Sequence, residues 1–235
     1  MEFDNSPISD KYKKKDPSYF QCERHEMLAF VPQDSNVILD VGCGAGNFAQ
    51  TLKLERNAEV WGIELDQSAG LVAAQKIDKV IIGNFNSKLD IPKYSFDCIV
   101  FNDVLEHLED PYSALSFCKE LLTNKGVIIA SIPNVRYFNN IWDLLVHKNW
   151  EYTEWGILDK THLRFFTYRS IISMFKKEGY QVELIKGINP LEKVDPHQVK
   201  KFKILNLLLC NNISDMRYLQ FAVVAKPINF KEYIN

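Results

Sequence analysis

The feature that most constrains the fold is a glycine-rich segment at residues 40–46. An apolar run at 37–39 leads into Asp40, after which three glycines alternate with small residues. An apolar helical pattern then begins at Phe48. Glycines at alternate positions allow a ligand to approach bare backbone. A strand, a ligand-binding loop and a helix are therefore expected in this order.

Two classes of nucleotide-like ligand use such a loop, and their charges distinguish them. A dinucleotide places its pyrophosphate at the helix N-terminus, where Asp40 would repel it. Asn47 also stands where the third glycine of the dinucleotide pattern would fall. The pattern G-x-x-x-x-G-K-[ST] of phosphate-binding loops does not occur in the sequence. S-adenosylmethionine carries an ammonium, a ribose diol and no phosphate, so it suits the acidic strand end better.

Strands and helices alternate after this loop. Apolar or β-branched runs predict further strands at 59–64, 80–82, 96–101, 127–132, 180–185 and 218–225. Asp110 before Pro111 predicts the start of one helix, and Gly179 predicts the end of another. Continuous apolar strands that alternate with helices are typical of a parallel sheet covered on both faces. Ligands of such sheets bind at the carboxyl ends of the strands.

The segment Asp40 to Gly46 resembles motif I of the class I S-adenosylmethionine-dependent methyltransferases. The resemblance implies a doubly wound α/β fold of the Rossmann-like type, with a seven-stranded, mostly parallel sheet and an antiparallel last strand. It also implies that S-adenosyl-L-methionine lies in the loop after the first strand. Glu64, about 20 residues past the loop, stands where a carboxylate binds the ribose hydroxyls.

The expected cofactor contacts come from the carboxyl ends of the first four strands and from a segment before the first strand. They are Asp40, Gly42, Cys43, Gly44, Gly46, Glu64, Leu65, Asn84, Phe85, Asn102, Asp103, Tyr19 and Arg24. Asn84 stands where related proteins usually carry an acid, and its Gly-Asn pair is equally typical of a turn. The side chain of Tyr19 fits cofactor contact and plain helix packing about equally well.

The length of 235 residues suits one domain with insertions. Residues 1–17 are polar and lysine-rich, so we expect a flexible arm followed by a single domain at 18–235. Two insertions, at about 135–165 and 190–214, interrupt the alternation of strands and helices. The first is rich in tryptophan and tyrosine, which favours a lid over the cleft, although aromatic residues at helical spacing more often belong to a core.

Charge and composition exclude several classes of partner. The formal net charge is −2, which disfavours nonspecific nucleic-acid binding because that needs a clustered positive surface. The five cysteines are scattered and never form a C-x-x-C pair, as in reduced intracellular proteins. We recognise no signal peptide and no apolar run of ~20 residues that could span a bilayer, so a cytoplasmic protein is expected. An apolar stripe at 205–209 could cover the sheet or a neighbouring subunit, and a homodimer is one option.

Four side chains are candidates for the chemistry. Asp103, Glu106 and His107 follow the fourth strand at i, i+3 and i+4, a spacing that predicts one shared helical face. His162 follows the aromatic insertion. Methyl transfer needs an oriented nucleophile and, for a hydroxyl, a proton acceptor, so Asp103, His107 and His162 are the expected catalytic residues. His107 could equally serve only to cap or pack its helix.

Two further resemblances concern the methyl acceptor. The pair Glu106-His107 and the Thr161-His162 element resemble the quinone-biosynthesis O-methyltransferases and the small-RNA terminal methyltransferases. The segment T-H-L-R-F-F-T at 161–167 resembles bacterial methyltransferases associated with surface sugars. These resemblances imply O-methylation of a small-molecule acceptor, a sugar or nucleotide-linked sugar, with a quinol or phenol as the alternative. A non-catalytic ligand-binding protein of the same fold is the rival class.

The same four side chains predict a divalent metal on the acceptor side of the cleft. Asp103, Glu106, His107 and His162 offer two carboxylates and two imidazoles, a set that suits Mg²⁺, Mn²⁺ or Zn²⁺. A metal ion would ease the loss of a proton from an acceptor hydroxyl near neutral pH. Asp103 is the weak point, because the resembling metal-dependent families carry glutamate there. Without a metal, His107 or His162 would act as the general base.

Overall fold

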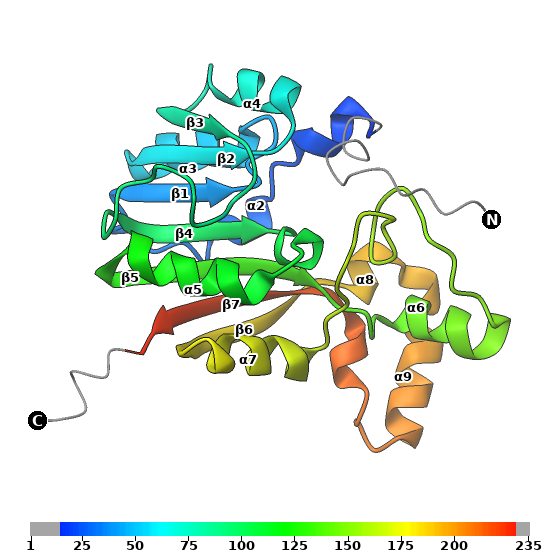
Figure 1. Cartoon of the computed structure of the whole chain (residues 1–235). Helices are drawn as coiled ribbons and strands as arrows, with labels where there is room; N and C mark the ends of the chain where they lie inside the picture. Colours follow the sequence, from blue (N-terminus) through cyan, green and yellow to red (C-terminus); the bar gives the residue numbers. More distant parts are fainter. Residues whose placement is uncertain (1–14, 229–235) are drawn as a thin grey trace, which may run out of the picture.

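The computed structural model describes residues 15–228, and a seven-stranded sheet forms its central layer (Figure 1). The strand order is β3-β2-β1-β4-β5-β7-β6. Strands β1 to β5 pair in parallel, whereas β7 runs antiparallel to both of its neighbours. The strands are β1 (Val37–Val41), β2 (Glu59–Glu64), β3 (Lys79–Ile82), β4 (Phe96–Asn102), β5 (Leu122–Pro133), β6 (Tyr180–Pro190) and β7 (Tyr218–Pro227). The predicted doubly wound, Rossmann-like fold with an antiparallel last strand is confirmed.

Alternate residues of the central strands enter two opposite apolar layers. In β1, Ile38 packs in the layer that α2 and α3 cover, whereas Leu39 and Val41 pack in the layer that α5 and α7 cover. Both faces are buried, which explains why the strands are continuous apolar runs in the sequence. The helices along the sheet are α2 (His25–Leu28), α3 (Asn47–Arg56), α4 (Gln67–Ala73), α5 (Pro111–Leu121) and α7 (Tyr168–Lys177).

The ends of two helices follow their sequence signals. The Asp110 carboxylate accepts hydrogen bonds from the backbone nitrogens of Tyr112 and Ser113, at 3.0 and 3.1 Å, and Pro111 is the first residue of α5. The cap satisfies two donors that the helix cannot, and proline has no donor to satisfy. At the end of α7, Gly179 takes the left-handed conformation with φ +72°.

The two insertions pack against each other. The first contributes α6 (Phe138–Trp142) and the π-helix η3 (Asp143–His147), and the second contributes α8 (Leu191–Val194), η4 (Pro196–Gln198), α9 (Val199–Leu208) and η5 (Ser214–Arg217). In their shared apolar cluster the ring centroids of Phe138 and Phe202 are 5.5 Å apart. Figure 1 shows α6, α8 and α9 together beyond the carboxyl ends of the parallel strands. The insertions therefore form one helical unit beside the ligand-binding edge of the sheet.

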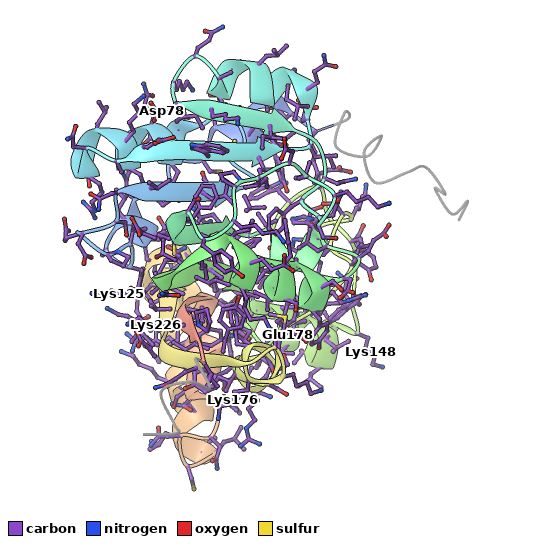
Figure 2. All side chains as sticks on the ribbon, turned by 60° about the vertical axis from the view of Figure 1, so that its left-hand side comes forward. Asp78, Lys125, Lys148, Lys176, Glu178 and Lys226 are labelled. Atoms are coloured by element: carbon purple, nitrogen blue, oxygen red, sulfur yellow. The ribbon has the colours of Figure 1, made fainter. Side chains whose placement is uncertain are left out.

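Charged side chains lie on the outside of this framework. Figure 2 shows Lys125, Lys148 and Lys226 projecting outward from the ribbon. At the opposite edge, Asp78 accepts hydrogen bonds from Lys53 Nζ at 2.6 Å and from the Val60 backbone nitrogen at 2.9 Å. Within residues 15–228, no helix has the length and apolar character needed to cross a membrane.

Candidate active site

A cavity of about 890 Å³ lies at the carboxyl ends of β1, β2 and β4. This is the edge of a parallel sheet at which ligands bind. Every predicted cofactor residue except Gly46 lines the cavity. At Gly46 a Cβ atom would be 3.0 Å from the Cβ atom of Ala73, so this glycine permits the close approach of α3 and α4. Its prediction as a cofactor contact is not supported by its position.

The glycine loop contacts the segment that precedes the first strand. Gly44 has φ +54°, and a Cβ atom there would lie 2.6 Å from the carbonyl oxygen of Phe20. That oxygen accepts a hydrogen bond of 2.8 Å from the Ala45 backbone nitrogen. Phe20 belongs to the short helix η1 (Pro17–Gln21). Only glycine combines this conformation with so close a contact, so position 44 fixes how η1 lies over the loop.

Two buried carboxyl groups flank the loop. Asp40 is 2% exposed, and its Oδ1 atom has no hydrogen-bond partner among the described residues. Burial, and then the charge of Glu64, raise the pKa of Asp40 to about 8. Glu64 accepts hydrogen bonds from the backbone nitrogens of Gly44 and Asp66, both at 2.8 Å. Burial raises the pKa of Glu64, and these two donors oppose the rise.

The polar atoms of the cavity wall fit S-adenosylmethionine. Both side-chain amide atoms of Asn102, at the end of β4, are buried and lack partners within the described chain. Buried polar groups need partners, so the Asp40 and Asn102 atoms indicate a polar ligand. An ammonium matches the Asp40 carboxylate, and the amide nitrogen of Asn102 can donate to a carboxylate. The residues present therefore suit the amino-acid end of the expected cofactor.

Asp103 does not take the place predicted for it. Its backbone is left-handed, with φ +54°, and the short helix η2 (Leu105–His107) begins only after it. The predicted helical face shared with Glu106 and His107 therefore does not form. The backbone nitrogen of Asp103 donates to both the carbonyl and the hydroxyl of Ser131, at 3.1 Å each, which holds this conformation. Aspartate tolerates the left-handed region better than most residues.

Both carboxylate oxygens of Asp103 are engaged. Oδ2 accepts from Arg24 Nη1 at 2.8 Å and from Gln220 Nε2 at 2.6 Å, and Oδ1 accepts from the Ser131 hydroxyl at 2.9 Å. Arg24 also donates to the Ser131 hydroxyl at 2.6 Å. Arg24 lines the cavity, but its guanidinium is committed to this network. Asp103 therefore positions Arg24 and the end of β4 and is not directed at the metal site predicted from the sequence.

Glu106, His107 and His162 do come together. Each of the three residues offers one possible metal-ligand atom, and these three atoms lie within 4.8 Å of one another. Glu106 is 1% exposed, and neither of its carboxylate oxygens has a hydrogen-bond partner among residues 15–228. The ring centroids of the two histidines are 4.6 Å apart, and His162 Nε2 lies 3.8 Å from Glu106 Oε1.

Backbone carbonyls set the orientation of both imidazoles. His107 Nδ1 lies 3.1 Å from the carbonyl oxygen of Thr161, and His162 Nδ1 lies 2.9 Å from that of Ile157. A carbonyl only accepts, so each Nδ1 carries a proton and each Nε2 is an acceptor. The Nε2 atom of His107 lies 3.5 Å from the Tyr19 hydroxyl. Such fixed tautomers are typical of metal-binding histidines.

Burial controls the protonation of this group. Burial, and then the neighbouring His162, lower the pKa of His107 to about 4, and burial also lowers the pKa of His162. Burial, followed by the charge of Asp103, raises the pKa of Glu106 well above its usual value. All three pKa shifts favour the neutral side chains when no cation is bound. A cation bound among them would restore the Glu106 carboxylate.

Sequence reasoning missed the residue that holds the first insertion to the cavity. The predicted arm at 1–17 lies outside the described residues as far as residue 14, but Lys15 is described. Its ammonium donates to the Asp159 carboxylate oxygens at 2.8 and 2.6 Å and also to the carbonyl oxygen of Glu154. Asp159 in turn accepts from the Thr161 backbone nitrogen at 2.8 Å. A continuous chain of contacts thus runs from Lys15 to the carbonyl that orients His107.

The aromatic side chains of the first insertion have different roles. Trp155 lines the cavity, together with its neighbours Glu154 and Gly156. Trp142 packs in the cluster of the helical unit, and Trp150 packs edge-on against Phe165 at 5.6 Å. Within the insertion predicted to form a lid, the segment around Trp155 borders the cavity, whereas the other two tryptophans pack locally, as aromatic residues at helical spacing often do.

Comparisons with known proteins agree with this geometry. The sequence model of a family described as "Methyltransferase domain" matches residues 12–185. The Methanocaldococcus jannaschii protein named "Uncharacterized protein MJ1252" is 25% identical over 201 residues, 77% of this chain and 76% of that protein. The ubiquinone biosynthesis O-methyltransferase of Chromobacterium violaceum is 28% identical over 150 residues, 57% of this chain and 63% of that enzyme. The crystal structure of a SAM dependent methyltransferase from Archaeoglobus fulgidus matches with a TM-score of 0.65 at 16% identity, over 92% of this chain and 97% of that one.

The family match begins before the glycine loop and extends into β6. It therefore includes the cavity, the imidazole pair and the segment around Trp155. The solved structure adds that the fold is shared over 92% of this chain. The chain belongs to the methyltransferase domain family and is a class I S-adenosylmethionine-dependent methyltransferase.

Proposed function

We propose that this enzyme methylates an oxygen of a small hydroxylated acceptor, a sugar or a nucleotide-linked sugar. The imidazole pair beside the cofactor cavity carries the proposal. His107 lines the cavity, whereas His162 is not among the lining residues and lies edge-on against the His107 ring. A sugar hydroxyl has to lose its proton as the new bond forms, and a neutral imidazole can accept it.

The residues of the cavity have different roles in this reaction. The bound cofactor supplies a methyl group on a sulfonium sulfur. Asp40, Glu64 and Asn102 bind its polar ends and so fix the direction of transfer, and orientation alone provides much of the rate. His107 or His162 accepts the acceptor proton at Nε2, because Nδ1 of each ring already donates to a carbonyl. A general base of this kind contributes about 10²- to 10⁴-fold.

We further propose that Glu106, His107 and His162 hold a divalent cation. Two imidazoles and one carboxylate form the donor set of catalytic zinc sites, and they suit Mn²⁺ as well. Mg²⁺ fits less well, because it prefers oxygen ligands. The buried Glu106 carboxylate without a partner within the described chain supports the proposal. A cation there would lower the pKa of an acceptor hydroxyl.

A quinol or phenol is the second candidate acceptor, and the similarity to the Chromobacterium violaceum ubiquinone enzyme favours it. The cavity wall favours the sugar class. Lys15, Ser18 and Glu154 line the cavity that Trp155 also borders. The Lys15 ammonium is bound by Asp159, but the Ser18 hydroxyl and the Glu154 carboxylate can accept hydrogen bonds from acceptor hydroxyls, whereas the ring of a quinol presents mainly apolar surface.

A turnover assay over an acceptor panel tests both proposals. Purified enzyme and S-adenosylmethionine would be incubated with free sugars, nucleotide-linked sugars, catechols and quinols, and S-adenosylhomocysteine would be measured. Turnover confined to the sugar class supports the preferred acceptor, and turnover confined to quinols replaces it. Undiminished turnover after exhaustive chelation, together with its loss in His162→Ala, would rule out the cation and leave the general base.

A further inference from the structure

The outer face and end of α9 are apolar and exposed. Ile204 is 53% exposed, Leu207 and Leu208 are 72% and 73% exposed, and Leu209 is 44% exposed. These four residues define the α9 apolar tip. Figures 1 and 2 both show this orange segment projecting away from the sheet. Such a group of large apolar side chains on a protruding element marks an interaction surface.

The fold does not need these side chains in its core. The opposite face of α9 already supplies the contact with the protein, since Phe202 is 4% exposed and packs edge-on against Phe138. Leu205 lies on this inner face and packs partly buried in the same cluster. A surface helix with one buried stripe normally carries polar residues on its other side. The α9 apolar tip departs from that pattern.

The first half of the helix is basic. Lys200, Lys201 and Lys203 are exposed, and no acidic residue occurs between 199 and 213. Lys201 Nζ lies 5.2 Å from the centre of the Trp142 ring, which joins the basic end of α9 to the end of α6. The surface therefore combines apolar side chains at its tip with three exposed lysines beside them, of which Lys203 lies within electrostatic reach of Glu192.

A second apolar run follows directly after Trp142. On the π-helix η3, Leu144 is 40%, Leu145 73% and Val146 50% exposed. Figure 1 shows η3, which continues α6, and α9 in the same helical unit. Two exposed apolar runs thus border the lysines of α9.

We propose that this face of the helical unit docks on an anionic lipid bilayer surface. Leucine side chains enter the boundary between head groups and acyl chains, while neighbouring lysines pair with anionic head groups. Pairing with a second copy fits the charges less well. In a two-fold contact through α9, the lysines of one copy would face either the lysines or the leucines of the other copy. Neither arrangement places a negative charge opposite the lysines. A bilayer supplies both the apolar layer and the negative charge.

Vesicle co-sedimentation of the full chain tests this proposal. The probes are vesicles of phosphatidylcholine alone and of phosphatidylcholine with phosphatidylglycerol. The wild type is expected to bind the anionic vesicles and to be released by salt, because each lysine contributes through an electrostatic term that salt screens. The double variant Leu207→Asp with Leu208→Asp is expected to bind at least about tenfold more weakly, since it loses two leucines that would be buried in the bilayer.

Two matched variants complete the test. Leu54→Asp, at a leucine of α3 that is 76% exposed on the opposite part of the molecule, is expected to bind like the wild type. Lys200→Gln with Lys201→Gln is expected to weaken binding to anionic vesicles by roughly tenfold. Thermal unfolding and S-adenosylhomocysteine binding verify that each variant is folded. Equal binding by the leucine variant and the wild type would overturn the proposal. Absence of wild-type binding to the anionic vesicles would also overturn it, and a dimer that the leucine variant dissociates would then assign this surface to a second copy.

Discussion

The two halves of the active-site cavity are built in different ways. The cofactor half comes mainly from one short run, Asp40 to Gly44, together with the strand ends at Glu64 and Asn102. The acceptor half joins segments that are distant in sequence, as in the contact of Lys15 with Asp159, 144 residues away. The first half depends on backbone conformation, and the second depends on side chains that long-range contacts hold in place. Substitutions in the two halves should therefore affect cofactor binding and turnover differently.

The largest effect is expected at Gly44, where Gly44→Val should abolish cofactor binding. The new Cβ atom would lie 2.6 Å from the Phe20 carbonyl oxygen at a φ of +54°, so the loop and η1 cannot both keep their positions. Calorimetry with S-adenosylhomocysteine measures the loss, expected to exceed about 100-fold. Leu54→Ala, on the exposed side of α3, is the control. Wild-type affinity in Gly44→Val would show that the cofactor half tolerates a change of backbone.

His162→Ala should instead separate catalysis from cofactor binding. Turnover is expected to fall about 10²- to 10⁴-fold, because the variant loses one of the two imidazoles proposed as the general base. The affinity for S-adenosylhomocysteine should stay within about twofold. His147→Ala, at an exposed histidine of η3, is expected to leave both quantities unchanged. Loss of cofactor affinity in His162→Ala would mean that the two halves are not independent.

Glu106→Gln tests the cation within the acceptor half. Glutamine keeps the size of the side chain but removes the negative charge. The metal content of protein purified in the presence of Zn²⁺ or Mn²⁺ should therefore fall by at least about tenfold. The fold should persist, because glutamine has the shape of glutamate and burial, which raises the pKa of Glu106, already disfavours the charge that the variant removes. Glu23→Gln, on the surface, is the control. A wild-type protein that retains no metal would contradict the proposed site.

The smallest effect is expected at Asp159, where Asp159→Asn should loosen the segment around Trp155. Burial alone would raise the pKa of Asp159, but hydrogen bonds from Lys15 and Thr161 lower it below 3.8. A lowered folded-state pKa stabilises the protein above the unfolded value, and this contribution is lost as pH falls through the lowered value. The variant should lose about 1–3 kcal/mol of stability at pH 7 and show less acid dependence in denaturant unfolding.

The ion pair of Lys53 with Asp78 provides the comparison for that experiment. Its atoms are 2.6 Å apart, but both side chains are about one third exposed. Solvent screens such a pair, so Asp78→Asn should change stability less than Asp159→Asn does. A larger loss at Asp78 would show that the contact of Lys15 with Asp159 does not hold the acceptor half together.

The sequence allows the cofactor half to be predicted almost completely, because its signals are local. Apolar strands, alternate glycines and a strand-end acid lie within a few residues of one another. Gly46 is the exception, since its neighbour Ala73 comes from another helix and only the folded chain shows that contact. The antiparallel direction of β7 followed from the resemblance and not from a local pattern, and its place between β5 and β6 was not predicted.

The acceptor half could be predicted only in part. The convergence of His107 and His162 followed from residue type and resemblance, but the conformation of Asp103 did not. That conformation depends on hydrogen bonds from Asp103 to Ser131 in β5, which no local pattern encodes. Lys15 was part of a lysine run, and a charge run is usually a solvated face. Its buried partner Asp159 could be identified only in the folded chain.

The segment at residues 15–21 has a consequence for the timing of the reaction. It lines the cavity and is tied to the glycine loop by the bond from the Ala45 nitrogen to the Phe20 oxygen and by the bond of Asn47 Nδ2 to the Gln21 oxygen at 3.0 Å. Lys15 ties its other end to the first insertion. Because a few bonds hold this part of the wall, we expect that the spent cofactor leaves only when these bonds break. The rate of product release should then depend on this segment, whereas the imidazole pair acts in the step before release.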